Sequence, residues 1–252
     1  TVDNEVLQLN NRGNPDFFSG GLGLGGQLGT NSRKGLEAGS FWGYQVDGIF
    51  QNQEELALFP KLGNQVPGDL RFVDLNGDGI ISPLDRTVIG SPTPNLIYGF
   101  FANVEIHGFD LSIDFNGQSG NQIINSKRMS RFGLYNFEAV YLDRWHGEGT
   151  SNTEPRVTTS GVNYEFSERF VEDGSFLRLR NVQVGYTLPK IILERLHVQT
   201  LRVYATGANL LTWQKYSGYT PEIFNSSVFD AGIDRGVYPL AKSLTVGLDL
   251  TF

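Results

Sequence analysis

The sequence contains no cysteine, and this absence excludes disulfide bonds and metal sites built on thiolates. It also lacks any run of the roughly 18 to 20 apolar residues that a membrane-spanning helix needs. Clusters of lysine and arginine are missing too, and a formal net charge of −7 argues against nucleic acid as a partner, because contact with phosphates needs a basic face. Glycine, with 31 residues, and aromatic residues, at 12%, are plentiful, and this balance is typical of β-rich, turn-rich proteins.

The last nine residues, LTVGLDLTF, alternate strictly between apolar and polar side chains. The apolar members are Leu244, Val246, Leu248, Leu250 and Phe252. A period of two gives a strand with one apolar and one wet face. A soluble domain rarely ends on an apolar strand with an aromatic last residue and nothing to cover it. The barrel of a bacterial outer-membrane protein, in contrast, ends with such a strand. The pattern therefore predicts a membrane β-barrel, and the mean hydropathy of −0.22 does not contradict it, because barrel strands expose only alternate residues to lipid.

Further strands are predicted by the same alternation, each bounded by Gly, Pro, Asn or Asp. The clearest are residues 96–106 and 109–118, and only His107-Gly108 separates them, which indicates a tight hairpin. In residues 176–188 the pattern slips by one residue, which suggests a bulge, or an exit from lipid, near Asn181. Weaker candidates lie at 201–211, 36–49 and 5–9. About seven strands leave two open edges, which hydrocarbon does not tolerate, so we expect the chain to be part of a larger barrel.

The connections between these strands differ greatly in length. Three are long, at about residues 50–94, 119–174 and 212–240, and the two short ones are His107-Gly108 and residues 189–200. Membrane barrels have short periplasmic turns and longer extracellular loops. This rule places the three long segments outside the cell and directs the last strand inward. The glycine-rich residues 11–34 fit the rule poorly, because they would form a long periplasmic turn.

Within the first long segment, the stretch FVDLNGDGIISPLDRTVIG has the spacing of a calcium-binding loop. Positions 1, 3, 5, 7, 9 and 12 are Asp74, Asn76, Asp78, the backbone carbonyl of Ile80, Ser82 and Asp85. Gly79 at position 6 permits the sharp turn, and Asp85 stands where glutamate is usual. The spacing favours a structural Ca²⁺ ion. The alternative is a metal-free loop of Asx turns, since Asp, Asn and Gly are ordinary turn formers.

Six stretches, spread along the chain in order, carry a family resemblance. They are GSFWGYQVDGIFQNQEEL, PGDLRFVDLNGDGIISPLDRTVIGSPTPNLIYGF, GFDLSIDFNGQSGNQIIN, DGSFLRLRNVQVGYTLP, LRVYATGANLLTWQKYSGYTPEI and YPLAKSLTVGLDLTF. With them the chain resembles the C-terminal part of a SusC/RagA-type TonB-dependent outer-membrane transporter of Bacteroidetes. The resemblance implies an antiparallel transmembrane barrel of roughly 22 strands with a plugged lumen, of which residues 1–252 supply the closing third. The plug domain, which is N-terminal in the family, has no counterpart in these residues.

The resemblance also implies a function: nutrient import across the cell outer membrane, with no enzymatic activity. Transporters of this type take up glycan fragments or peptides together with a SusD-like surface lipoprotein. They are energised by TonB, ExbB and ExbD, which act through the N-terminal part that this sequence lacks. This chain would contribute closing strands, extracellular loops and a surface in contact with outer-membrane lipid.

Two other classes of protein compete with this interpretation. One is a soluble extracellular β-sandwich binding module with a calcium-stabilised loop, which would bury the apolar residues between Phe109 and Phe115 in a core. The other is a surface hydrolase, for which the pairs Glu54-Glu55 and Glu172-Asp173 are candidate acid-base carboxylates. Both pairs fall in predicted loops with no converging partner, so the sequence disfavours catalysis.

Overall fold

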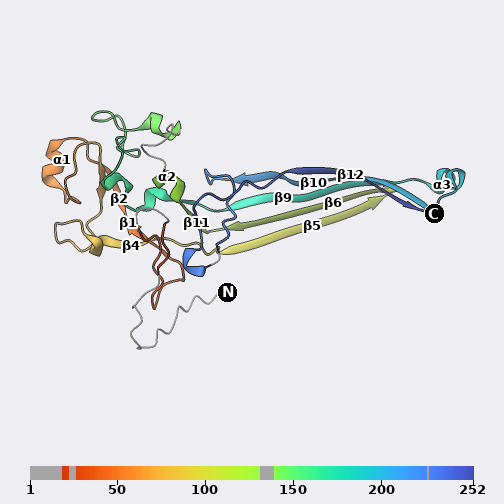
Figure 1. Cartoon of the computed structure of the whole chain (residues 1–252), viewed down its shortest axis with the longest axis horizontal. Coiled ribbons are helices and arrows are strands. Elements are labelled where there is room, and N and C mark those ends of the chain that lie inside the picture. Colours follow the sequence, from red (N-terminus) through yellow and green to blue (C-terminus); the bar gives the residue numbers. More distant parts are fainter. Residues whose placement is uncertain (1–18, 23–26, 131–138, 226) are drawn as a thin grey trace. The chain divides into compact units, whose positions relative to one another are not determined.

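A computed structural model of the chain describes residues 19–22, 27–130, 139–225 and 227–252, and it divides into two compact units (Figure 1). The first unit comprises Thr1–Pro92, Gln122–Glu172 and Glu222–Val237, and the second comprises Thr93–Asn121, Asp173–Pro221 and Tyr238–Phe252. Each of the three long predicted segments runs largely or partly through the first unit. Both short turns belong to the second unit.

The second unit is a single antiparallel sheet with the strand order β12-β10-β9-β6-β5. Its strands are β5 (Leu96–Ile106), β6 (Phe109–Ser119), β9 (Phe176–Thr187), β10 (Thr200–Gln214) and β12 (Ser243–Thr251). A short helix, α3 (Lys190–Leu196), lies in the connection between β9 and β10. Because neighbouring strands run in opposite directions, the β5–β6 turn, α3 and the end of β12 share one end of the sheet (Figure 1). The five strands and the tight hairpin are confirmed.

One face of this sheet is apolar and exposed. A row of side chains, one from each strand, crosses it through paired positions: Ile106, Phe109, Tyr186, Val203 and Leu248. In this row, Ile106, Phe109 and Leu248 are each 59% exposed. A contiguous apolar surface of this kind is unfavourable in water and marks a site that meets lipid or another protein. The exposure contradicts the β-sandwich alternative, in which a core would cover the apolar residues of β6.

A bulge in β9 keeps the apolar side chains on this face where the sequence pattern slips. Asp114 of β6 pairs with Asn181 of β9, but the following residue, Phe115, pairs with Leu179. Arg180 is therefore an extra residue on β9. The insertion of one residue restores the phase of the alternation, so Leu179 shares the face of the apolar residues beyond the bulge. The bulge predicted near Asn181 is confirmed.

The weaker strand candidate at residues 36–49 does not extend this sheet. It forms β1 (Phe41–Tyr44) and β2 (Val46–Ile49), which pair antiparallel with β4 (Arg86–Gly90) and β3 (Leu70–Phe72) in the first unit. Its large apolar side chains are buried rather than exposed on one face, because they pack into the core of that unit. The candidate at 5–9 lies outside the described residues. Within the described part of the chain, the sheet therefore has five strands instead of about seven.

The first unit is built of short elements around two apolar clusters. Its remaining elements are α1 (Gln53–Leu58), α2 (Ser126–Ser130), β7 (Gln122–Asn125), β8 (Val171–Asp173), β11 (Ile233–Asp234) and 3-10 turns at Pro83–Asp85, Ala139–Asp143, Val162–Tyr164, Glu168–Phe170 and Val228–Asp230. One cluster contains Leu22, Phe41, Ile124, Met129, Tyr164, Phe166, Phe170 and Ile233. The other contains Tyr44, Ile49, Leu70, Phe72 and Ile81. Among all described residues of the chain, no helix is long and apolar enough to span a bilayer.

The opposite face of the five-stranded sheet is polar and carries an ion-pair network centred on Arg202 of β10. The guanidinium donates two hydrogen bonds to the carboxylate of Asp110 on β6, at 3.0 and 2.7 Å. It donates a third to Asp249 on β12, at 3.1 Å. Strand β9 runs between Arg202 and Asp110, and Gly185 lies at the crossing, where an added side-chain carbon would stand 2.4 Å from Asp110 Oδ1. The missing side chain lets one arginine tie β6, β10 and β12 together across β9.

We expect Gly185→Ala to separate Arg202 from Asp110 and to lower the free energy of unfolding by about 1.5–3 kcal/mol, the usual contribution of hydrogen bonds to charged groups. Thermal denaturation of the full-length protein measures this change. Gly99→Ala is the matched control, because its added carbon would meet its nearest neighbour, the carbonyl oxygen of Phe115, at an ordinary 3.5 Å. An unchanged melting temperature for Gly185→Ala would contradict the role assigned to the glycine.

Candidate functional site

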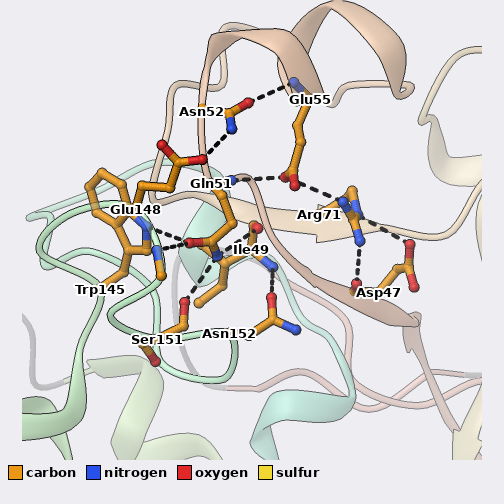
Figure 2. A network of polar contacts seen from close by, with 11 residues as sticks. Asp47, Ile49, Gln51, Asn52, Glu55, Arg71, Trp145, Glu148, Ser151 and Asn152 are labelled. Carbon is orange, nitrogen blue, oxygen red and sulfur yellow. Dashed lines mark hydrogen bonds and ion pairs between the residues drawn. The ribbon is translucent and has the colours of Figure 1, made fainter.

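The side chain of Gln51, directly after β2 and Phe50, joins this strand end to residues 145–151 (Figure 2). Its amide nitrogen donates to the carbonyl oxygens of Ile49 and Ser151, at 3.1 and 3.0 Å. Its amide oxygen accepts from Trp145 Nε1 at 3.1 Å and from the backbone N–H of Gly149 at 2.9 Å. Both donors and both lone pairs of the amide are thus used. The contact to Ser151 fastens segments that are 100 residues apart in the sequence.

The N-terminus of α1 is capped by the residues that follow Gln51. Asn52 Oδ1 accepts from the backbone N–H of Glu55 at 3.0 Å, and Glu55 Oε2 accepts from the backbone N–H of Gln51 at 2.9 Å. A side-chain oxygen and an acidic group at these positions satisfy otherwise unpaired N–H groups of the first turn. Asn52 Nδ2 also donates to Glu148 Oε1 at 2.6 Å, so the cap is tied to the same distant loop (Figure 2).

Arg71 of β3 joins the network from the strand side. Its Nε lies 3.1 Å from Asp47 Oδ2, and its Nη1 lies 3.4 Å from Glu55 Oε2. Its Nη2 donates to the backbone carbonyl of Asp47 at 2.9 Å, and its guanidinium carbon lies 4.4 Å from the centre of the Phe59 ring. Only 17% of the arginine side chain is exposed. The arginine therefore holds α1 against β3 and β2.

These residues surround a hollow of about 320 Å³ in the first unit. Its lining residues are Ile49, Gln51, Glu55, Arg71, Gly149, Ser151 and Asn152. The network fixes their polar groups at defined positions, which is the property of a site that orients a ligand through hydrogen bonds.

The second unit has a larger hollow of about 710 Å³ on the polar face of the sheet, at the end that carries the short turns. The ion pair of Arg202 with Asp110 forms part of its wall, together with Gln183 and Glu105. Gln183 accepts a hydrogen bond from the Thr206 hydroxyl at 3.0 Å. The hollow is thus lined by charged and amide side chains that the strands present at alternate positions.

The predicted calcium loop is held by a ladder of Asx turns. Asp74 accepts from the backbone N–H groups of Gly77 and Gly79, each at 2.8 Å. Asn76 Oδ1 accepts from the Asp78 N–H at 2.9 Å, and Asp78 Oδ1 accepts from the N–H of residue 80 at 2.9 Å. In addition, Asn76 Nδ2 donates to Asp78 Oδ2 at 3.0 Å. The structure thus brings the first three predicted ligands into one turn, where each of these oxygens accepts one hydrogen bond from within the loop.

Asp85, the predicted ligand at the twelfth position, is fully buried and closes the loop. Its Oδ1 accepts from the N–H groups of Leu75 and Asn76, at 3.0 and 3.4 Å, and its Oδ2 accepts from the Ser82 N–H at 2.8 Å. Burial acts to raise its pKa, but the hydrogen bonds from Ser82, Asn76 and Leu75 outweigh it, so the pKa lies below the ordinary 3.8. The Ser82 hydroxyl accepts from Leu84 N at 3.2 Å.

Acidic and histidine side chains do not gather into a metal cluster. Among the residues that the structure describes, no three His, Cys, Asp or Glu side chains are grouped to hold an ion, and this includes Asp74, Asp78 and Asp85 of the loop. The carbonyl-bearing residue at the seventh position, Ile80, is 64% exposed. The predicted ligands are of four chemical kinds, namely carboxylate, amide, hydroxyl and backbone carbonyl oxygens.

The acidic pairs that sequence reasoning considered for catalysis have structural partners instead. Glu55 takes part in the network of Arg71, and Glu172 Oε1 accepts from Asn125 Nδ2 at 2.9 Å. Asp173 accepts from the backbone N–H of Ser175 at 2.9 Å, and its pKa is lowered chiefly by that residue. These bonds cap turns and join strands, so the carboxylates do not converge on a common site.

Sequence reasoning missed the two residues on which these networks depend, Gln51 and Arg202. The Asn-Gln-Glu-Glu run at residues 52–55 is a readable helix-start signal. The partners of Gln51 are not readable, because they lie 94 to 100 residues further along the chain. The alternation of β10 places Arg202 on the polar face. Its bond to Asp110 passes over Gly185, and this depends on the register of β6, β9 and β10, which the sequence does not show.

Comparison with curated proteins finds several receptors that are similar in sequence to this chain, although no family model matches it. TonB-dependent receptor P3 of Formosa agariphila is 34% identical over 232 residues, which are 87% of this chain and 23% of that receptor. TonB-dependent receptor SusC of Bacteroides thetaiotaomicron is 27% identical over 255 residues, which are 99% of this chain and 23% of SusC. The chain thus spans about a quarter of the length of the curated relatives it matches.

Solved structures share the fold. The RagAB peptide transporter matches with a TM-score of 0.68 at 25% identity, over 89% of this chain and 24% of the matched chain. The RagAB peptide importer in its open-open state matches with a TM-score of 0.67 at 24% identity, over 89% of this chain and 23% of the matched chain. The antiparallel sheet described above is therefore a segment of a larger β-barrel.

We expect Gln51→Ala to loosen residues 145–151, because four hydrogen bonds to one amide are lost together. The Gly149 N–H donates directly to the amide oxygen of Gln51. Its hydrogen exchange should accelerate on the order of tenfold, because a loss of about 1.4 kcal/mol of local stability changes the rate by that factor. Gln53→Ala, which removes an exposed glutamine from the same helix start, is the control and should leave exchange unchanged. Equal exchange in both variants would show that Gln51 does not hold the loop.

Proposed function

This chain belongs to the SusC/RagA-type TonB-dependent receptors, as a C-terminal portion of their β-barrel, and we propose that the whole protein imports glycan fragments or peptides across the outer membrane. The observation that carries the proposal is the two-faced sheet. Its apolar face is exposed, and its opposite face is polar, with Arg202 joined to Asp110 and Asp249. In a barrel, such a sheet turns the first face to lipid and lines an aqueous lumen with the second.

The first unit supports a role in recognition. It collects parts of all three long connections, which in membrane barrels lie on the extracellular side. Long-range bonds such as those of Gln51 hold these connections in a defined shape, and a defined shape lowers the entropic cost of binding a ligand. We assign this unit the contacts with substrate and with a SusD-like surface lipoprotein, and we assign it no catalytic step.

The energy for import is proposed to come from the TonB, ExbB and ExbD proteins. This chain would take no direct part in that contact, because the family's plug and TonB-contacting segment are N-terminal. Its own task is to form closing strands, lumen wall and outer loops in a barrel that lies in the outer-membrane lipid.

The transport proposal predicts that a strain without the full-length gene loses uptake of one nutrient class. Uptake of labelled oligosaccharide and peptide pools should fall in the deletion strain and return on complementation with the intact gene. Collapse of the proton gradient should abolish the restored uptake, because TonB-dependent import draws on it. Unchanged uptake of both pools in the deletion strain would contradict an import function.

We also propose that the loop from Asp74 to Asp85 binds a structural Ca²⁺ ion. Its donors are hard oxygens at the spacing that such a loop requires. The acceptor oxygens of Asp74, Asn76 and Asp78 each take a single hydrogen bond, so a lone pair is left on each for a cation. The kinds of donor and their spacing therefore suit the ion.

Asp78→Asn separates metal binding from loop folding. Asparagine keeps an oxygen for the N–H of Ile80 and gives up only the exposed hydrogen bond from Asn76 Nδ2, so stability in chelator should change little. Loss of the negative charge should remove one bound Ca²⁺ per full-length protein in equilibrium dialysis. Asp143→Asn, at an exposed aspartate outside the loop, is the control. If Asp78→Asn and the wild type bind equal amounts of calcium, the loop is the metal-free Asx ladder.

A further inference from the structure

Helix α3 exposes a wide apolar surface that no other described residue of the chain covers. Of its apolar side chains only Leu193 is buried, at 6% exposure. Ile191 is 70% exposed, Ile192 42% and Leu196 51%. At about 100° per residue, Ile192 and Leu196 lie one turn apart on one face, with Ile191 and Leu193 at its two edges. Three of the four apolar residues on this arc are therefore exposed.

The apolar arc lies at the same end of the sheet as an exposed apolar surface of the strands. Leu188 donates its backbone N–H to the Leu201 carbonyl at 2.9 Å, which joins the two strand ends from which α3 departs. On the other side, the Gln199 N–H donates to the Thr251 carbonyl at 2.8 Å, which ties the exit of the helix to β12. The helix is thus fixed at this end of the sheet, where Phe252 of the apolar face is 82% exposed.

Both ends of α3 are firmly defined. Pro189 precedes the helix with a φ of −69°, a value that suits a helix start, and His197 ends it in the left-handed region at a φ of 54°. The His197 N–H donates to the carbonyl of Glu194 at 3.3 Å, and the Val198 N–H donates to the carbonyl of Leu193 at 3.2 Å. The exposed apolar residues therefore belong to a fixed element.

The charges of α3 suit a membrane boundary. In a projection down the helix axis, Lys190 and Glu194 lie opposite the apolar arc. Arg195 lies between Ile191 and Ile192. Arginine and lysine beside an apolar surface extend their charged ends toward the water and the anionic head groups of lipid. An amphipathic helix with cationic residues and aliphatic residues on one arc is the pattern of an element that lies in the membrane interface.

We propose that α3 is an interfacial helix, with Ile191, Ile192 and Leu196 inserted among the lipids of the leaflet next to the short turns. The proposal rests on the proposed function, because it takes the adjoining face of the sheet as the lipid-facing surface of a membrane barrel. The helix would continue that surface past the strand ends. It would anchor the short-turn end of the barrel at the depth of the head groups and upper acyl chains.

The absence of cysteine from this chain allows a direct test in the full-length receptor. Single cysteines are introduced as Ile192→Cys and Glu194→Cys in α3 and as Val184→Cys on the apolar face of β9, after any cysteine elsewhere in the receptor is replaced. Each is labelled with an environment-sensitive fluorophore, and the receptor is reconstituted in vesicles of phosphatidylethanolamine and phosphatidylglycerol. Quenching is measured with lipids brominated on the acyl chains and with iodide in the water.

We expect brominated lipid to quench the label at Ile192→Cys, as at Val184→Cys, and iodide to quench it at Glu194→Cys. If Val184→Cys is quenched by lipid but Ile192→Cys is not, the helix meets water or protein, and the interfacial role is overturned while the barrel stands. If neither is quenched by lipid, the membrane-barrel proposal falls as well. Leu196→Cys repeats the measurement on the same arc should Ile192→Cys fail to assemble.

Discussion

The structure depends on one constraint: every strand of the five-stranded sheet must keep its apolar side chains on the same face. A shift by a single residue would exchange the two faces of a strand and place charged groups against lipid. The extra residue Arg180 shows how strictly the constraint is kept, because it corrects the phase at the position where the pattern slips. Leu179, beyond the bulge, lies on the same face as the apolar row from Ile106 to Leu248 as a result.

Two glycines of the sheet make room for side chains that connect strands which are not neighbours. At Gly185 the missing side chain makes room for the ion pair of Arg202 with Asp110, and at Gly117 it makes room for the ring of Tyr98. The Tyr98 hydroxyl crosses β6 in this way and donates to the carbonyl of Phe176 on β9 at 2.9 Å. Side chains thus connect strands that are not neighbours, on both faces of the sheet, and they add register-specific contacts to the backbone ladder.

The first unit follows a different physical rule. Its elements are short, and their hydrogen bonds link segments far apart in the sequence, as Gln51 does with Ser151 and Trp145. Such contacts fix loops that have little regular structure of their own. A local pattern specifies the sheet, and long-range polar contacts specify the loop unit. This difference fits the transporter that we propose, in which strands form the wall and loops form the recognition surface.

The sequence by itself determined the five strands, the hairpin at His107-Gly108 and the bulge near Asn181, because a period of two is a local property that is read directly from neighbouring residues. It also determined the run of oxygen donors from Asp74 to Asp85, although it left their ligand open. Residues 36–49 were assigned to the wrong sheet, because an alternating pattern does not say whether its apolar side chains meet lipid or a core. Only the tertiary structure decided that, and only it decided the partners of Gln51 and Arg202. Those partners come from distant strands and loops, and their proximity depends on register and packing, which no local pattern encodes.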